Sequence, residues 1–356
     1  MTPQDLVRPE ILALKAYPVE KSGGMVKLDA MENPYPLPEA LRRELAEVLS
    51  RVDLNRYPDP SAPQLRELIA RRMGVPAGME VLLGNGSDDL IQIVTLTVAR
   101  PGAVMMYPGP TFVMYAMNAT FFGLRAVPVG LREDFSLDAA AFVAAVREHR
   151  PAVVYLAYPN NPTGVLYPEE DVLEIIRACE GLVVLDEAYH AFARRTFMPR
   201  LAEFPNLVVM RTVSKIGMAG LRLGYVCGKP EWIEAFDKTR SPFNVNVVTE
   251  AVAIKLLENK RVLDEQSARV LAERERMRPE LERLPGVKVF PTAANFFLVR
   301  VPDAKRVFDG LLRQGVLVRN VDSPLMKNCL RLTVGTPEEN ARLLEALASI
   351  PGSQHA

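Results

Sequence analysis

The sequence predicts an α/β protein with two units: a mainly parallel, seven-stranded sheet flanked by helices, followed by a smaller α+β unit. Between about residues 79 and 227, short apolar runs alternate with amphipathic helical segments. Several of these runs are continuously apolar over four to six residues, as is typical of strands covered on both faces. After residue 247 the pattern changes to a long helical stretch and then to shorter strands and helices.

The strands of the first unit are predicted from its apolar runs, which cover residues 79–86, 103–110, 124–130, 151–159, 182–189, 206–215 and 221–228. The helical segments between them include residues 137–149 and 168–180, and the second opens with proline and acids, as helix starts do. Strands that alternate with helices predict a mainly parallel sheet covered by helices. Only the short segment 216–220 joins the last two runs, so we expect one of them to run antiparallel.

The second unit begins with a long, charged helical stretch over residues 248–284. Its predicted strands cover residues 287–290, 295–301, 316–321 and 329–335, and its predicted helices cover 304–315 and 337–350. We therefore expect a large domain at residues 41–247 and a small C-terminal domain at 248–356. Residues 1–40 are predicted to form an arm and a connector that contributes to the small domain.

The composition excludes several classes of function. Lys and Arg together number 43, as do Asp and Glu, so no strong charge points to nucleic acid or an anionic membrane. The longest apolar runs are far shorter than the roughly 20 residues of a membrane-spanning helix, and the N-terminus lacks the apolar stretch of a signal peptide. Three scattered cysteines and three histidines favour neither disulfides nor a metal site. A reduced, cytoplasmic compartment is expected.

Polar and small residues gather at the ends of five apolar runs, at residues 84–89, 107–112, 158–164, 186–190 and 212–215. Ligands of open α/β sheets bind beyond the carboxyl ends of the strands. We therefore expect these five segments to meet at one crevice, which no single segment indicates alone.

Two of these strand ends suit a charged ligand. Asp186 follows four apolar residues, so its carboxylate lies at the mouth of a buried strand and needs a cation or hydrogen-bond donors. An N-cap or a satisfied buried acid would explain it equally well. Residues 84–89 place small residues at a helix start, where free N–H groups and the helix dipole favour a phosphate. Many ordinary strand-to-helix turns are also rich in glycine.

Lys215 is the third chemical signal. Most lysines are solvated surface charges, but a partly desolvated lysine near the cationic Arg222 should have a lowered pKa and greater nucleophilicity toward carbonyls. Arg222 and the hydroxyl of Ser214 suit a phosphate. An anion site, a reactive lysine and a buried carboxylate, here Asp186, are the protein groups that pyridoxal phosphate needs.

The segments "PNNPTG" (159–164), "DEAY" (186–189), "SK…GLRLG" (214–224) and "LRLTVG" (330–335) resemble, in this order, the aspartate-aminotransferase-type, fold-type I pyridoxal-phosphate enzymes. The resemblance spans most of the chain. Within that group, "LDAMENPYPLP" (28–38), "RYPDP" (56–60) and "LGNGSDDLI" (83–91) resemble the histidinol-phosphate aminotransferase family. The loop from Lys215 to Arg222 is one residue shorter than the commonest pattern of the superfamily, which predicts a tighter turn.

The resemblance implies a role for each matching residue. Lys215 attaches the cofactor and acts as general base and acid, and Asp186 pairs with the pyridinium nitrogen. Asn161 and Tyr189 donate hydrogen bonds to the phenolic oxygen, and Phe112 stacks on the ring. The implied phosphate ligands are Ser87, Asp88, Thr212, Ser214, Arg222 and, from a second subunit, Tyr57. The implied substrate contacts are Tyr17, Asn33, Arg319 and Arg331.

By the same resemblance the reaction is a ping-pong transamination between L-histidinol phosphate and 2-oxoglutarate. It yields imidazole acetol phosphate and glutamate in L-histidine biosynthesis, and the enzyme is a homodimer with shared active sites. An aromatic aminotransferase or a threonine-phosphate decarboxylase would share the cofactor residues. A non-catalytic regulatory or binding module would be marked by loss of Lys215 or Asp186, and both are present.

Overall fold

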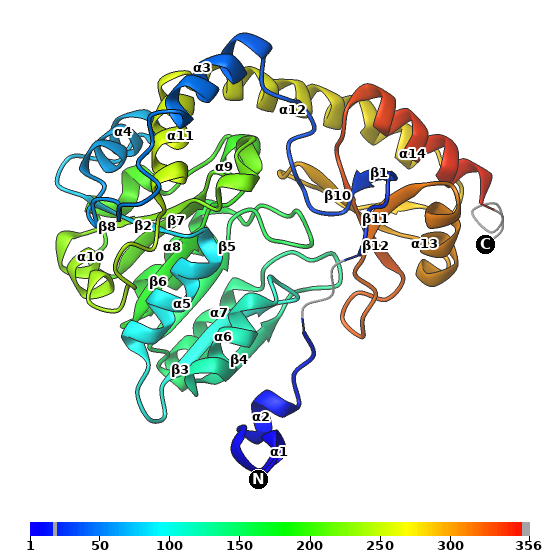
Figure 1. Ribbon diagram of the computed structural model, residues 1–356. Helices are drawn as coiled ribbons and strands as arrows, with labels where there is room; N and C mark the ends of the chain where they lie inside the picture. Colours follow the sequence, from blue (N-terminus) through cyan, green and yellow to red (C-terminus); the bar gives the residue numbers. More distant parts are fainter. Residues whose placement is uncertain (17–19, 351–356) are drawn as a thin grey trace.

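The computed structural model describes residues 1–16 and 20–350, which form two sheets with helices packed around them (Figure 1). The larger sheet has seven strands in the order β2-β8-β7-β6-β5-β3-β4. All neighbouring pairs are parallel except those of β8, which runs antiparallel to both β2 and β7, as expected from the short connection before it. The strands are β2 (Glu80–Gly84), β3 (Val104–Gly109), β4 (Arg125–Gly130), β5 (Val153–Ala157), β6 (Leu182–Asp186), β7 (Leu207–Thr212) and β8 (Gly224–Gly228).

Helices cover both faces of this sheet. In β5, Val154 and Leu156 belong to one apolar cluster, whereas Val153 and Tyr155 belong to another on the opposite face. The first cluster is covered by α3 (Glu39–Leu49), α4 (Pro63–Met73), α7 (Ala139–His149), α8 (Glu169–Ala178) and α11 (Val247–Glu258). The second is covered by α5 (Ser87–Val98), α6 (Met114–Phe122) and α10 (Pro230–Asp237). Burial on both faces explains why the strands are continuously apolar.

The smaller sheet has five strands in the order β1-β11-β12-β10-β9. Its strands are β1 (Val26–Leu28), β9 (Lys288–Val289), β10 (Phe296–Arg300), β11 (Val316–Asn320) and β12 (Cys329–Thr333). Three helices accompany it: α12 (Lys260–Glu282), α13 (Ala304–Arg313) and α14 (Pro337–Ser349). Strand β1 comes from the N-terminal connector and pairs in parallel with β11. The domain boundaries at residues 41 and 248 stay a prediction.

The predicted helical stretch 248–284 is two helices, because the chain breaks at Asn259 between α11 and α12. Asn259 has φ −98° and ψ 27°, and its Nδ2 donates to the carbonyl of Lys255 at 2.9 Å. An asparagine side chain that bonds nearby backbone competes with the helical pattern. Figure 1 shows α12 running from the large sheet to the small one.

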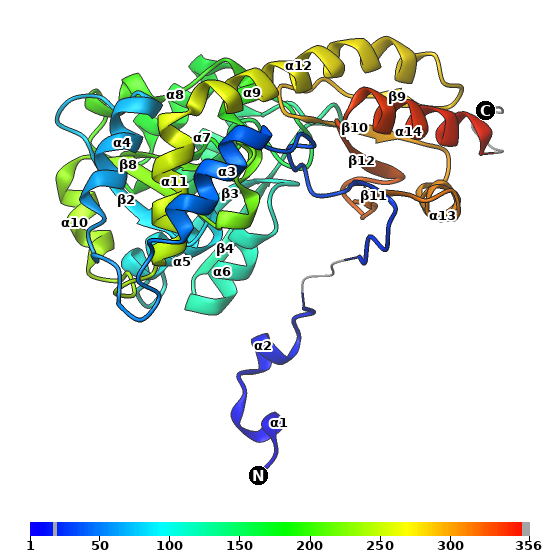
Figure 2. The ribbon, with the colours of Figure 1, turned by 45° about the horizontal axis from the view of Figure 1, so that its top comes forward.

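The remaining elements are short: α1 (Pro3–Leu6), α2 (Pro9–Leu12), α9 (His190–Ala193) and the 3₁₀ turns Met198–Ala202, Ser214–Ile216 and Ala219–Leu221. Figure 2 shows α1 and α2 projecting away from the two sheets. Arg8, between them, donates to the carbonyl of Phe121 at 2.7 Å. Within residues 1–16 and 20–350, no helix combines the length and the apolar character needed to cross a membrane.

Candidate functional site

A cavity of about 400 Å³ lies at the carboxyl ends of β5, β6 and β7. The crevice predicted from the strand ends therefore exists. It brings together most of the predicted site residues, namely Ser87, Asp88, Phe112, Asn161, Asp186, Tyr189, Thr212, Ser214, Lys215 and Arg222.

Lys215 lies in the 3₁₀ turn directly after β7, and its Nζ donates to the carbonyl of Ala30 at 3.0 Å. Burial, and secondly the positive charge of Arg331, lower the pKa of Lys215 to about 8. Arg222, which the sequence argument credited, contributes less than either. The amine thus has the lowered pKa expected of it, mainly because it is removed from water.

Asp186 ends β6 and is buried against the cavity. The hydroxyl of Tyr115 donates to its Oδ2 at 2.7 Å, and the N–H of Ala188 donates to its Oδ1 at 3.1 Å. Burial nevertheless raises the pKa of Asp186 to about 6. Among the residues that the structure describes, no lysine, arginine or histidine lies within 4.0 Å of this carboxylate. A cationic group of a ligand would therefore be stabilised beside it.

Tyr115 was missed by the sequence argument. It lies in α6, is fully buried, and stacks on Tyr155 with ring centroids 4.8 Å apart. The hydroxyl of Tyr155 in turn lies 3.0 Å from that of Thr95, so the donor to Asp186 is held by a buried chain. In the sequence, Tyr115 could have been suspected only from its position three residues after Phe112, because residues about one turn apart lie on the same side of a segment.

A candidate anion site lies where β2 leads into α5. Gly86, with φ +86°, precedes the helix, and no side chain caps the first-turn N–H groups. A Cβ on Gly224 of β8 would lie 2.7 Å from the nitrogen of Ser87, so only glycine leaves room there. Free N–H groups at a helix start favour an anion.

Side chains complete this anion site. Arg222 donates from Nη2 to Oδ2 of Asp88 at 3.2 Å, and both side chains are about half exposed. The hydroxyl of Thr212 donates to that of Ser214 at 2.8 Å. The loop between Lys215 and Arg222 contains two 3₁₀ turns, and its tightness relative to the superfamily pattern stays a prediction.

Aromatic and amide residues also line the cavity. Phe112 meets Tyr115 edge-on at 5.8 Å, and the Tyr189 hydroxyl donates to the sulfur of Met31 at 3.0 Å. Nη1 of Arg331 donates to Oδ1 of Asn161 at 2.6 Å. This bond fixes the amide orientation and leaves the Nδ2 group of Asn161 as a donor.

A second cavity of about 270 Å³ shares Phe112 and Asn161 with the first, and Arg319 and Arg331 line it. These two arginines are directly opposed on the antiparallel strands β11 and β12. Like charges at opposed positions repel one another, and a bound anion would offset this repulsion. Nη2 of Arg331 also donates to the carbonyl of Asp29 at 2.7 Å.

Two of the predicted residues that the structure describes, Tyr57 and Asn33, line neither cavity. Tyr57 is 81% exposed and stacks on Phe243 at 4.6 Å. Asn33 lines an adjoining cavity with Ser214, and its Nδ2 donates to Oε1 of Gln266 at 3.0 Å. Tyr17 lies outside the described residues.

The family model for aminotransferase class I and II matches residues 23–347. The chain belongs to this family. It is 55% identical over 355 residues to histidinol-phosphate aminotransferase 1 of Burkholderia lata, with 99% of each chain covered. It is 58% identical over 351 residues to histidinol-phosphate aminotransferase 2 of Cupriavidus pinatubonensis, covering 97% of this chain and 96% of that one.

A solved structure extends this similarity to the fold. The histidinol-phosphate aminotransferase of Sinorhizobium meliloti, in complex with pyridoxal-5'-phosphate, has a TM-score of 0.86 and 27% identity, with 97% of each chain covered. The resemblance derived from the sequence motifs and the predicted fold class are therefore confirmed.

Proposed function

We propose that this chain is a pyridoxal-phosphate-dependent histidinol-phosphate aminotransferase. It transfers the amino group of L-histidinol phosphate to 2-oxoglutarate, giving imidazole acetol phosphate and glutamate, in histidine biosynthesis. The observation that carries the proposal is the single cavity in which the partly buried Lys215 and the buried Asp186 meet the candidate anion site at the start of α5. The two relatives above, at 55% and 58% identity, carry the same activity in their names.

The residues of the cavity fit pyridoxal phosphate. Asp186 is a buried carboxylate that lacks a cation among the described residues and suits a protonated ring nitrogen. The uncapped start of α5, with Arg222 and Ser214, suits the phosphate. Lys215 supplies the amine for attachment. When bound, the cofactor supplies a ring that withdraws electrons from the substrate carbon that loses its proton.

Lys215 is the proposed proton carrier. Its pKa of about 8 leaves part of the amine neutral near physiological pH, as a general base requires. Once displaced from its covalent link by the substrate amine, Nζ would accept the proton that the substrate carbon loses and would deliver it to the cofactor carbon that bears the transferred amino group. The carbonyl of Ala30, 3.0 Å from Nζ, keeps the amine directed into the cavity.

The other residues hold the charges in place. Asp186 keeps the ring nitrogen protonated, and the Tyr115 hydroxyl stabilises the ionised form of this carboxylate. Asn161, oriented by Arg331, and Tyr189 are the proposed donors to the phenolic oxygen. Phe112 supplies an apolar ring wall.

Arg319 and Arg331 are the proposed substrate-anion site. Histidinol phosphate brings a phosphate and 2-oxoglutarate brings two carboxylates, so one site must accept either anion. A guanidinium can bind both bidentately. The cavity that the two arginines line adjoins the proposed cofactor cavity through Phe112 and Asn161, so an anion bound by these arginines would lie next to the cofactor. Asn33 and Tyr17 remain predicted substrate contacts.

A homodimer with shared active sites is part of the proposal. Tyr57 is 81% exposed and Leu54 is 75% exposed, and a second copy of the chain would cover this apolar surface. In the dimer, Tyr57 is proposed to donate to the phosphate of the partner's site. A cytoplasmic location also stays a prediction.

The test is a comparison of kcat/KM for histidinol phosphate, histidinol and phenylalanine with 2-oxoglutarate as acceptor. Histidinol lacks the phosphate, so it should be worse by about a hundredfold or more, which corresponds to about 2.7 kcal/mol of transition-state binding. Phenylalanine matching histidinol phosphate would replace the proposal with an aromatic aminotransferase. Carbon dioxide release from threonine phosphate would replace it with the decarboxylase.

Arg319→Gln makes the comparison specific to the proposed anion site. It should reduce the preference for histidinol phosphate over histidinol at least about tenfold, because one of the two guanidinium groups proposed to bind the phosphate is lost. Arg300→Gln is the matched control, since Arg300 is also an arginine of the small sheet but lines a different cavity. An equal loss of preference in both variants would contradict the assignment.

A further inference from the structure

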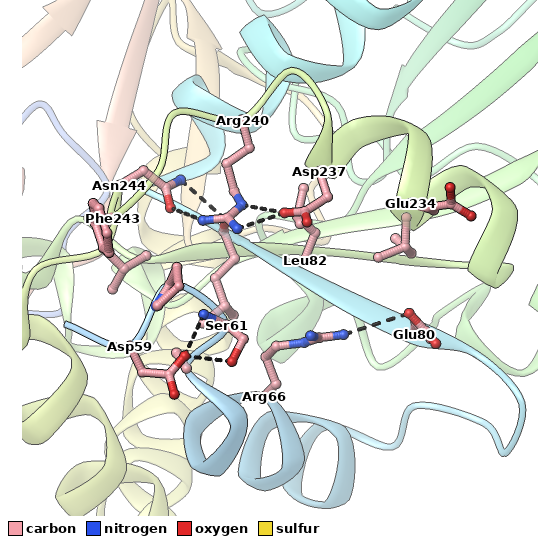
Figure 3. Close-up of a pocket in the computed structure, with 15 residues that line it drawn as sticks. Asp59, Ser61, Arg66, Glu80, Leu82, Glu234, Asp237, Arg240, Phe243 and Asn244 are labelled. Carbon is pink, nitrogen blue, oxygen red and sulfur yellow. Dashed lines mark hydrogen bonds and ion pairs between the residues drawn. The ribbon is translucent and has the colours of Figure 1, made fainter.

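The segment 240–246 lies between α10 and α11 and forms one wall of a further cavity of about 320 Å³, separate from those described above (Figure 3). Arg240 reaches along this wall between Asp237 and Asn244, as Figure 3 shows. Its Nε donates to Oδ1 of Asp237 at 2.7 Å, and its Nη1 donates to Oδ1 of Asn244 at 3.1 Å. The Arg240 side chain is only 12% exposed, so the amide of Asn244 is held in one orientation.

The amide nitrogen of Asn244 points toward the turn between β2 and α5, residues 84–89, where the phosphate is proposed to bind. Nδ2 of Asn244 donates to Oδ2 of Asp89 at 2.9 Å and to the carbonyl of Leu83 at 3.2 Å. The same Oδ2 of Asp89 accepts the backbone N–H of Asn85 at 2.7 Å. Hydrogen bonds therefore run without a break from Arg240 through Asn244 and Asp89 to the loop that precedes α5.

The position of Asp89 links these hydrogen bonds to phosphate binding. Asp89 lies in the first turn of α5, where a carboxylate is attracted to the same N–H groups that a phosphate would use. An unrestrained carboxylate there would compete with the phosphate and repel it. Oδ2 of Asp89 instead accepts hydrogen bonds from Asn244 and from the N–H of Asn85, which precedes the helix. The first-turn N–H groups stay uncapped.

We infer that Asn244, oriented by Arg240, is a positioning residue for the cofactor's phosphate, because it holds Asp89 away from the N–H groups at the start of α5. The inference rests on the proposed function, since it assigns the ligand of these N–H groups. The same segment carries Phe243, which stacks on Tyr57 at 4.6 Å. Segment 240–246 thus contacts both the chain's own phosphate turn and the tyrosine proposed to serve the partner.

The experiment measures the equilibrium binding of two probes to the cofactor-free protein: pyridoxal phosphate, and pyridoxal, which lacks the phosphate. Asn244→Ala should weaken pyridoxal phosphate about tenfold or more, equivalent to about 1.4 kcal/mol, while pyridoxal binding changes less than about twofold. Arg66→Gln is the matched control, because Arg66 lines the same cavity but forms an ion pair with Glu80, at 3.7 Å, and has no contact of this kind with the turn. It should bind both probes as the wild type does.

A reciprocal exchange separates positioning from general damage. Asn244→Asp alone places two carboxylates together and should weaken pyridoxal phosphate more than Asn244→Ala. Combining it with Asp89→Asn restores one donor and one acceptor, and should recover at least about half of the lost binding free energy. Equal weakening of both probes, loss in the Arg66→Gln control, or no recovery in the double variant would each overturn the inference.

The wild type separates this inference from the proposed function. Wild-type protein that binds no pyridoxal phosphate overturns both. Tight binding by the wild type, with no loss in Asn244→Ala, overturns the inference alone.

Discussion

Replacing Asp186 by asparagine should stabilise the cofactor-free protein while impairing the enzyme. Burial raises the pKa of Asp186 from 3.8 to about 6, so the ionised carboxylate is disfavoured in the folded chain. Because the folded pKa lies above the unfolded one, this group lowers stability as the pH rises through that interval. At about 1.36 kcal/mol per pKa unit, the full loss is about 3 kcal/mol at pH 7.5 and only about 1 kcal/mol at pH 4.5.

The asparagine does not titrate, so Asp186→Asn removes this cost and keeps an acceptor for one of the two donors. The variant's advantage in free energy of unfolding, measured by urea titration of the cofactor-free protein, should grow by about 2 kcal/mol between pH 4.5 and pH 7.5. Turnover should fall by well over tenfold with cofactor still bound, because the ring nitrogen loses its negative partner.

Asp264→Asn is the matched control. Asp264 is a helical aspartate whose side chain is 59% exposed and pairs with Lys260, so its replacement should change stability little at either pH. If Asp186→Asn does not raise the free energy of unfolding, or raises it equally at both pH values, Asp186 is not a carboxylate that burial destabilises in the absence of a cation. Near-normal turnover would refute its catalytic role.

Three further outcomes are expected. The purified protein should be yellow, and borohydride reduction should abolish its visible absorbance band and attach the cofactor permanently to one lysine. Mass spectrometry should then find the added cofactor mass on the peptide containing Lys215, and finding it on another lysine contradicts the assignment. Mixing inactive Lys215→Ala chains with strongly impaired Tyr57→Phe chains should give hybrids more active than either parent, because one shared site is then intact; no recovery argues against sharing. Tyr115→Phe removes a donor to ionised Asp186 worth about 1.5–3 kcal/mol, so the low-pH limit of pyridoxal phosphate binding should move up by about one to two pH units; an unchanged limit excludes this role.

The strand ends could be predicted from the sequence because connectivity alone places them. Parallel strands joined by helices bring their carboxyl ends to one edge, so Asp186 at the end of β6 and Lys215 after β7 had to lie near each other. The break at Asn259 could not be predicted, since it depends on one side chain competing with helical bonds on either side.

Contacts between segments that are distant in the sequence could not be predicted either. Tyr115 meets Asp186 only because α6 packs across the sheet, and the hydrogen bond joins residues 71 positions apart. The opposition of Arg319 and Arg331 depends on the register of β11 and β12, which the intervening loop sets. Asn244 lies in a segment with no chemical signature, and its contact with Asp89 spans 155 positions.

Lys215 and Asp186 share a property that links stability to function. Burial favours the neutral form of each group: it lowers the pKa of the lysine to about 8 and raises the pKa of the aspartate to about 6. Such opposed shifts are unfavourable in the empty fold and concentrate at functional sites. A ligand with a cationic ring nitrogen and an aldehyde relieves both, because one group gains a counter-charge and the other becomes a covalent link. A ligand that binds only the folded chain stabilises it by an amount that grows with the logarithm of its affinity, so pyridoxal phosphate in excess should raise the stability of the wild type more than that of Asp186→Asn. An equal gain in both would mean that the carboxylate contributes nothing to holding the cofactor.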